Sequence, residues 1–97
     1  MSFDARENEW HIGLTPLAVE DVNEILSWLE IESASAAIRL AENLDEVWDH
    51  LGRMPFLGRI SHDSQLSQRG FRCLIIQEYQ IFYKLENGEN RIYQVRK

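Results

Sequence analysis

The 97-residue sequence contains a single cysteine, only two prolines and no long apolar segment. Cys73 cannot form a disulfide within the chain and lies in an apolar stretch, so we expect it to be a small core residue. No apolar run approaches the roughly 20 residues that a membrane-spanning helix needs. Residues 1–7 are acidic and lack an apolar core, which argues against a signal peptide. Together these absences predict a cytoplasmic protein with no membrane partner.

Basic residues are also scarce, because ten Lys and Arg stand against sixteen Asp and Glu, for a formal net charge of −6. This balance argues against broad binding to nucleic-acid phosphates and leaves room only for a local basic patch. His11, His50 and His62 are spread along the chain without the spacing of metal ligands, so we expect no metal and no other cofactor. The length and a hydrophobic content of 44% predict one globular domain over residues 1–97, with residues 1–8 as a flexible tail.

The C-terminal stretch from Gly70 to Lys97 organises the rest of the chain. Three short runs rich in Ile, Tyr and Phe are separated by polar breaks, which predicts a three-stranded antiparallel meander. Asn87-Gly88 is the strongest turn signal, since both residues tolerate positive φ. A two-residue turn there would pair Phe82 with Tyr93, whereas a five-residue loop would pair Tyr83 with Tyr93. The two registers differ by one position and exchange the faces of the last strand.

Both faces of this meander are apolar. If Gln77-Glu78 is a two-residue turn, one face carries three facing pairs, Arg72 with Tyr83, Leu74 with Ile81 and Ile76 with Tyr79. The other face carries Phe71, Cys73, Ile75 and Phe82. One layer of helices covers only one face, and we expect the face of Leu74, Ile76, Tyr79 and Ile81 to form a groove for a second polypeptide. The alternative is a thicker core covered by the chain itself.

The N-terminal half predicts one strand and two helices. Residues 9–14 alternate as a strand does, and Thr15-Pro16 fits a helix N-cap followed by proline. An amphipathic helix then runs to about Glu30, and a second runs from a cap at Ser33 or Ser35 to Gly52. The short link between them predicts a helical hairpin. The expected fold is therefore α+β, with a helical hairpin packed on a small antiparallel sheet in the order β-α-α-β-β-β, and residues 53–69 form a long connection.

Several sequence segments in this order resemble the RelE/ParE toxin family of bacterial type II toxin–antitoxin systems. The resemblance extends from Leu14 to Val95 and is closer to the ParE branch. It rests on Leu14-Thr15-Pro16, the Pro-x-x-Gly-Arg turn within Met54–Arg59, Phe71-Arg72, the strand Tyr79–Lys84 and the strand Ile92–Val95.

The resemblance implies a toxin that is neutralised by a cognate antitoxin. ParE-like members inhibit DNA gyrase by protein–protein contact, whereas RelE-like members cleave messenger RNA on the ribosome. The chain ends at Arg96-Lys97, carries Gln77-Glu78 where the family usually has a turn glycine, and is acidic. The C-terminal end and the acidic charge favour a gyrase-binding toxin, or a toxin fold that has lost toxicity, over a ribosome-dependent endoribonuclease. A toxin–antitoxin hetero-oligomer is the expected assembly.

Candidate site residues follow from these two readings. For binding an antitoxin or a target, they are the residues of the expected groove face: Arg72, Leu74, Ile76, Tyr79, Ile81 and Tyr83. Metal-independent RNA cleavage needs a proton acceptor and a cation near the reacting phosphate. Under that alternative the candidates are Arg59, Arg72, Tyr83 and Arg96.

Overall fold

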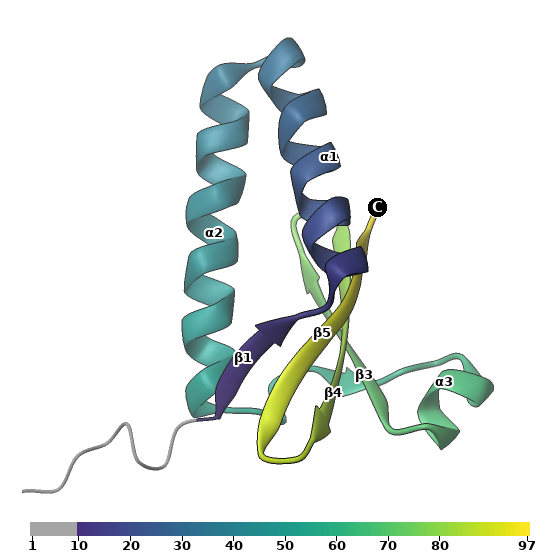
Figure 1. Cartoon of the computed structure of the whole chain (residues 1–97). Coiled ribbons are helices and arrows are strands. Elements are labelled where there is room, and N and C mark those ends of the chain that lie inside the picture. The colour runs from purple at the N-terminus through teal and green to yellow at the C-terminus, as the bar shows by residue number, and fades with distance from the viewer. Residues whose placement is uncertain (1–9) are drawn as a thin grey trace, which may run out of the picture.

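The computed structural model describes residues 10–97 and shows a helical hairpin against a twisted sheet (Figure 1). The expected tail at residues 1–8 lies outside this range. The elements in chain order are β1 (His11–Leu14), α1 (Pro16–Glu32), α2 (Ala34–Arg53), β2 (Arg59–Ile60), α3 (Ser64–Gln68), β3 (Phe71–Ile76), β4 (Tyr79–Glu86) and β5 (Glu89–Arg96). The predicted α+β order is confirmed, and the long connection additionally contains the short elements β2 and α3.

The sheet has the strand order β1-β5-β4-β3-β2 and is mixed rather than antiparallel. The pairs β2–β3, β3–β4 and β4–β5 are antiparallel, but β1 runs parallel to β5. The prediction of a fully antiparallel sheet is therefore wrong at β1. Parallel neighbours need a long connection, and the helical hairpin and the other strands supply it.

The two turns of the meander match the sequence signals. Gln77 has φ 54°, and the turn at Asn87 and Gly88 has φ 53° and 74°, so both hairpins close with two residues. The register between β3 and β4 is as predicted, with Arg72, Leu74 and Ile76 opposite Tyr83, Ile81 and Tyr79.

The register between β4 and β5 contains a bulge that the sequence analysis did not anticipate. Tyr83 faces Ile92, but Phe82 faces Gln94, so Tyr93 is the extra residue. Both predicted pairings of Tyr93, with Phe82 and with Tyr83, are wrong. The bulge shifts the alternation of β5 by one residue, and as a result Ile92 and Val95 both face the helices and are buried.

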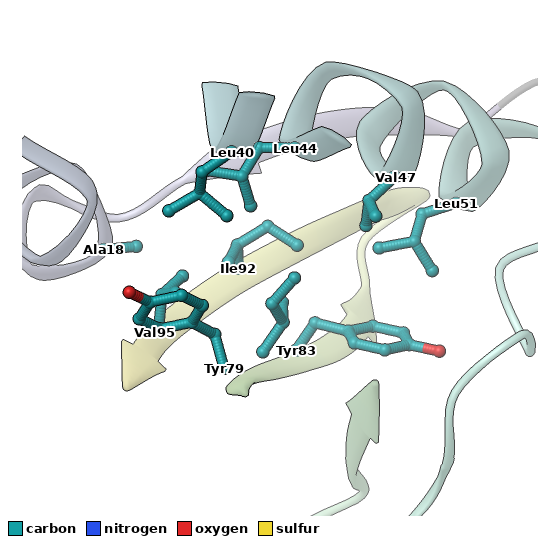
Figure 2. Packing of buried hydrophobic residues seen from close by; sticks show 10 residues of the cluster. Ala18, Leu40, Leu44, Val47, Leu51, Tyr79, Tyr83, Ile92 and Val95 are labelled. Carbon is teal, nitrogen blue, oxygen red and sulfur yellow. The ribbon is translucent and has the colours of Figure 1, made fainter. Parts of the chain in front are cut away.

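The core lies between the hairpin and one face of the sheet (Figure 2). The helices contribute Ala18, Leu40, Leu44, Val47 and Leu51, and the sheet contributes Tyr79, Ile81, Tyr83, Ile92 and Val95. These residues recur every three or four positions on α2 and every second position on β4, as burial on one side requires, whereas the bulge places Ile92 and Val95 of β5 three positions apart.

The helix ends use local caps. The Thr15 hydroxyl accepts a hydrogen bond from the Ala18 N–H, and the Ser33 hydroxyl accepts one from the Ala36 N–H, both at 3.2 Å. Ser33 alone separates the helices, so α1 runs slightly past the expected end at Glu30. Gly52 does not terminate α2, which continues to Arg53. Instead its carbonyl accepts the Trp10 N–H at 2.8 Å, and a Cβ there would lie 3.3 Å from the Trp10 oxygen.

Helix α1 replaces a strand beside the last part of β5. Strand β1 stops at Leu14, opposite Ile92. Beyond it, the Thr15 hydroxyl donates to the Tyr93 carbonyl at 3.3 Å, and the Val95 N–H donates to Asp21 Oδ2 at 3.0 Å. These side-chain bonds satisfy backbone groups that β1 is too short to reach.

Replacing Asp21 with alanine should lower the free energy of unfolding by about 1–3 kcal/mol, because the Val95 amide loses a charged acceptor. Urea denaturation of the purified chain measures the change. Glu24→Ala on the same helix is the matched control, since Glu24 is exposed. Equal midpoints for the two variants would show that the Asp21–Val95 bond does not stabilise the fold.

Candidate functional site

The face that we expected to form a groove is the face that packs against the helices. Tyr79, Ile81 and Tyr83 are 4%, 0% and 0% exposed, and Leu74 and Ile76 pack beside them against the core cluster. The prediction of an open face there is wrong. Both faces of β3 are apolar, so the periodicity of β3 could not decide which one the hairpin covers.

The opposite face of the sheet carries a groove of about 460 Å³. Its floor is formed by outward residues of β3 and β4, and its wall by the segment that contains β2 and the start of α3. The lining residues are Leu57, Gly58, Arg59, Ile60, Ser61, His62, Asp63, Leu66, Cys73, Leu74, Ile75, Gln80, Phe82 and Arg96. The groove thus combines an apolar floor with a few polar groups, as binding sites for polypeptides or small molecules commonly do.

Two arginines give this groove a positive character. The Arg96 guanidinium lies 4.6 Å from the centroid of the Phe82 ring, and Arg59 faces Cys73 in the β2–β3 register. Burial raises the pKa of the Cys73 thiol, while Arg59 and Arg96 lower it in part. The Asp63 carboxylate also lines the groove, but it accepts the Gln65 and Leu66 amides at 2.9 and 3.1 Å as the cap of α3.

The net charge of −6 is unevenly divided between the two halves of the chain. Residues 16–53, the helical hairpin, carry nine acidic and two basic side chains, a net charge of −7. Residues 54–97 carry seven basic and four acidic side chains, a net charge of +3. The net positive charge therefore belongs to the segment that forms β2 to β5, and Arg59 and Arg96 of this segment line the groove.

Arg72 and Tyr83 hold the backbone of Gly58 from the helix side of the sheet. Arg72 Nη1 donates to the Gly58 carbonyl at 2.8 Å, and the Gly58 N–H donates to the Tyr83 hydroxyl at 2.6 Å. The Arg72 guanidinium also lies 4.8 Å from the centroid of the Phe56 ring. We call this arrangement the Gly58 clamp.

The clamp explains why a glycine stands in the Pro-x-x-Gly-Arg turn. A Cβ at Gly58 would lie 2.7 Å from the Tyr83 hydroxyl and 2.9 Å from the Cys73 carbonyl oxygen, both too close. Burial raises the pKa of the Tyr83 phenol, and the Gly58 hydrogen bond and Arg72 lower it in part. Tyr83 is therefore a neutral, buried support for the loop.

The four residues proposed for RNA cleavage do not converge. Arg72 and Tyr83 are engaged with Gly58, whereas Arg59 and Arg96 line the groove on the other face. Among residues 10–97 no group of three or more His, Cys, Asp and Glu side chains is arranged to hold a metal ion. No helix in the same range is long and apolar enough to span a membrane.

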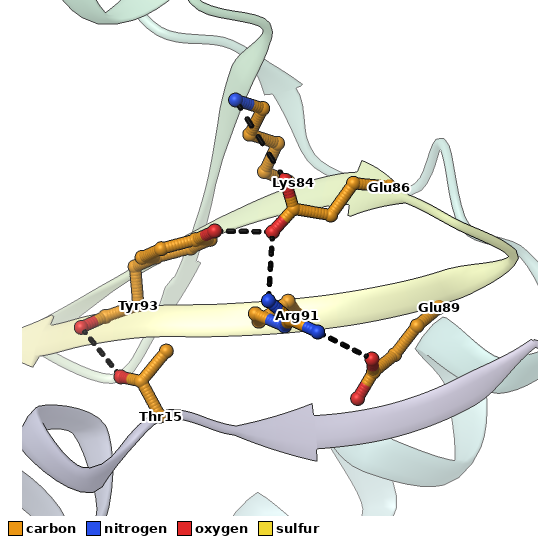
Figure 3. A network of polar contacts seen from close by, with 6 residues as sticks. All are labelled: Thr15, Lys84, Glu86, Glu89, Arg91 and Tyr93. Atoms are coloured by element: carbon orange, nitrogen blue, oxygen red, sulfur yellow. Dashed lines mark hydrogen bonds and ion pairs between the residues drawn. The ribbon is translucent and has the colours of Figure 1, made fainter.

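The rest of the outer face is occupied by its own polar contacts (Figure 3). Near the Asn87-Gly88 turn, Glu86 accepts the Tyr93 hydroxyl and pairs with Arg91 at 3.3 Å, and Arg91 also pairs with Glu89 at 2.9 Å. These partly exposed pairs contribute little stability individually. They do satisfy one another, which leaves the half of the face near Gln77-Glu78 as the open part.

The outer-face residues Cys73, Ile75 and Phe82 were recognised as a face but not as the site. A second signal was present in their cross-strand neighbours. Apart from Phe82 and Tyr93, the outer positions of β4 and β5 are polar, whereas the inner ones are mostly Tyr, Ile and Val. The polar outer residues are Gln80, Lys84, Glu86, Glu89, Arg91, Gln94 and Arg96. Polar neighbours mark a face that meets water, so the alternation of β4 and β5 could have selected it.

The comparisons with known proteins agree with this fold. Residues 12–96 match the family described as ParE toxin of type II toxin-antitoxin system, parDE. The structure is similar to the solved chromosomal ParDE toxin–antitoxin system from P. aeruginosa, with a TM-score of 0.74 and 16% sequence identity. That similarity covers 93% of this chain and 97% of the other. No curated protein sequence matches the chain.

The family match places the chain among the toxins of type II toxin–antitoxin systems. Within this class, the chain belongs to the ParE toxin family. The predicted assignment to the ParE branch is thereby confirmed.

Replacing Tyr83 with phenylalanine should destabilise the chain by about 1–3 kcal/mol, because the buried Gly58 amide loses its acceptor. Thermal or urea unfolding measures the loss. Tyr79→Phe is the matched control, since no hydrogen bond of the Tyr79 hydroxyl occurs among the described residues. If both variants unfold at the midpoint of the unsubstituted chain, the clamp does not hold the loop.

Proposed function

We propose that the chain is a ParE-like toxin that inhibits DNA gyrase by protein–protein contact and is neutralised by a cognate antitoxin. Membership of the family supports the toxin role, and the resemblance to the ParE branch supports gyrase as the target. Gyrase acts on chromosomal DNA, so this target places the chain's action in the cytoplasm.

The observation that carries the proposal is the open groove on the outer face. A groove of about 460 Å³ with an apolar floor and two arginines fits a segment of a second polypeptide that carries apolar and acidic side chains. The antitoxin is the natural occupant, because neutralisation requires a partner that remains bound to the toxin. Binding at this face needs neither a cofactor nor a reaction.

Expression of the chain without an antitoxin should arrest growth with filamentation and DNA damage, because inhibited gyrase leaves DNA breaks and blocked replication. Purified chain should inhibit supercoiling of relaxed plasmid by gyrase. Co-expression of a small DNA-binding antitoxin encoded next to the gene should restore growth. The chain bearing Gly58→Leu is the inactive control for growth arrest and gyrase inhibition, because a large side chain at position 58 collides with Tyr83.

Two outcomes would contradict the proposal. Arrest with rapid loss of translated messages, and with active gyrase, would indicate the ribosome-dependent endoribonuclease instead. Normal growth at full expression of the folded chain would indicate a toxin fold without toxicity.

A further inference from the structure

Helix α1 has a second apolar surface in addition to the one that packs against the sheet. Ala18 and Leu29 belong to its core side. Leu17, Trp28 and Ile31 lie elsewhere on the helix, and they are 53%, 55% and 84% exposed. Leu17 precedes Trp28 by eleven residues and Ile31 follows it by three, about three turns and one turn of a helix. These three residues therefore form one exposed stripe, which we call the α1 flank.

The surroundings of the α1 flank are acidic. Residues 16–32, which form α1, contain five acidic side chains and no basic one. Glu24 lies on the same side as the flank, seven residues after Leu17 and four before Trp28. It is exposed and forms no ion pair with any residue of the described range 10–97. The flank therefore presents apolar side chains beside a carboxylate that has no cationic partner in that range.

The groove on the outer face of the sheet has the matching chemistry. Ile60 and Ile75 line it and are 59% and 60% exposed. Arg59 and Arg96 also line it, and neither forms an ion pair with a residue of the described part of the chain. The carboxylate in the lining belongs to Asp63, which accepts two amides as the cap of α3. This groove therefore fits an apolar surface that brings a carboxylate of its own.

The α1 flank and the groove cannot meet within one molecule. The helical hairpin covers one face of the sheet, and the groove lies on the opposite face. The end of the hairpin where α1 meets α2 projects well beyond the sheet (Figure 1). Trp28 and Ile31 lie in the last two turns of α1, so they can enter a groove on a neighbouring molecule without a collision of the two sheets.

We propose that copies of this chain associate head to tail, with the α1 flank of one copy seated in the groove of the next. Trp28 and Ile31 pack on the apolar floor, and the Glu24 carboxylate pairs with Arg59 or Arg96. The hairpin and the segment that forms the sheet carry opposite net charges, which favours this orientation, whereas two hairpins repel each other. The two surfaces differ, so the interface is heterologous, and each pair keeps a free flank and a free groove for further copies.

This association covers the groove that the proposed function assigns to the antitoxin. Only this consequence rests on the proposed function, because the two surfaces are defined by the chain itself. An interface of a few side chains is weak, so the association should form at about 100 μM and dissociate at about 1 μM. A concentrated chain therefore masks its own groove, and a dilute chain leaves the groove open.

Sedimentation velocity of the purified chain over this concentration range is the first test. The weight-average sedimentation coefficient should rise with concentration. It should fall again in about 1 M salt, where screening weakens the pair between Glu24 and the arginines of the groove. A monomer at every concentration up to about 500 μM, where even a weak interface is populated, would overturn the proposal. Association that salt leaves unchanged would also overturn it, because the ion pair is part of the contact.

Mixing two variants distinguishes a head-to-tail contact from a symmetric one. The flank variant carries Glu24→Gln and Ile31→Gln, and the groove variant carries Arg59→Gln and Arg96→Gln. Each variant alone should associate at least about tenfold more weakly than the unsubstituted chain. A mixture of the two should form a complex of one copy of each with the affinity of the unsubstituted chain, because each variant keeps one surface intact.

All four substituted side chains are exposed, so both variants should keep the unfolding midpoint of the unsubstituted chain. Glu46→Gln and Arg69→Gln, at exposed residues outside both surfaces, are the matched controls and should leave the association unchanged. Full association of either variant alone, or no complex in the mixture, would overturn the proposal. None of these measurements depends on growth arrest, gyrase or an antitoxin, so the inference and the toxin function can fail separately.

Discussion

The arrangement of this chain depends on one contact, in which Arg72 and Tyr83 grasp the backbone of Gly58. Both side chains come from facing positions of β3 and β4, so the pairing of these two strands brings them together around Gly58. The contact ties residues 54–60 to the sheet, delivers Arg59 to the outer face and excludes any side chain at position 58. One tyrosine hydroxyl and one guanidinium thus position one wall of the candidate site.

The sheet divides its two faces between stability and recognition. On the helix side, bulky residues of β4 and β5 are buried against a hairpin that is strongly acidic elsewhere. On the outer side, ion pairs close the part near Asn87-Gly88, while the part near Gln77-Glu78 keeps an apolar floor with two arginines. The net charge of −6 is therefore a poor guide to any one surface, since the charges are segregated by element.

Much of the fold could be predicted from local signals. Thr15 and Ser33 indicate helix caps, Asn87-Gly88 indicates a turn, and a two-residue turn at Gln77-Glu78 sets the register of β3 and β4. The parallel placement of β1 and the bulge at Tyr93 could not be predicted, because each depends on contacts between segments far apart in sequence. The covered face was misassigned because β3 alone is apolar on both sides, and Arg72 looked like a binding residue because no local pattern reveals a loop carbonyl as its partner.

The parallel pairing of β1 with β5 affects when the sheet can be completed during synthesis of the chain. His11 of β1 lies opposite Glu89 of β5, so the two paired residues are 78 positions apart in the sequence. Moreover β5, the last strand to be synthesised, takes a central place in the sheet between β1 and β4. Until β5 has emerged from the ribosome, a nascent chain can form the helical hairpin, but β1 has no partner strand. Completion of the five-stranded sheet is thereby deferred until β5 is available.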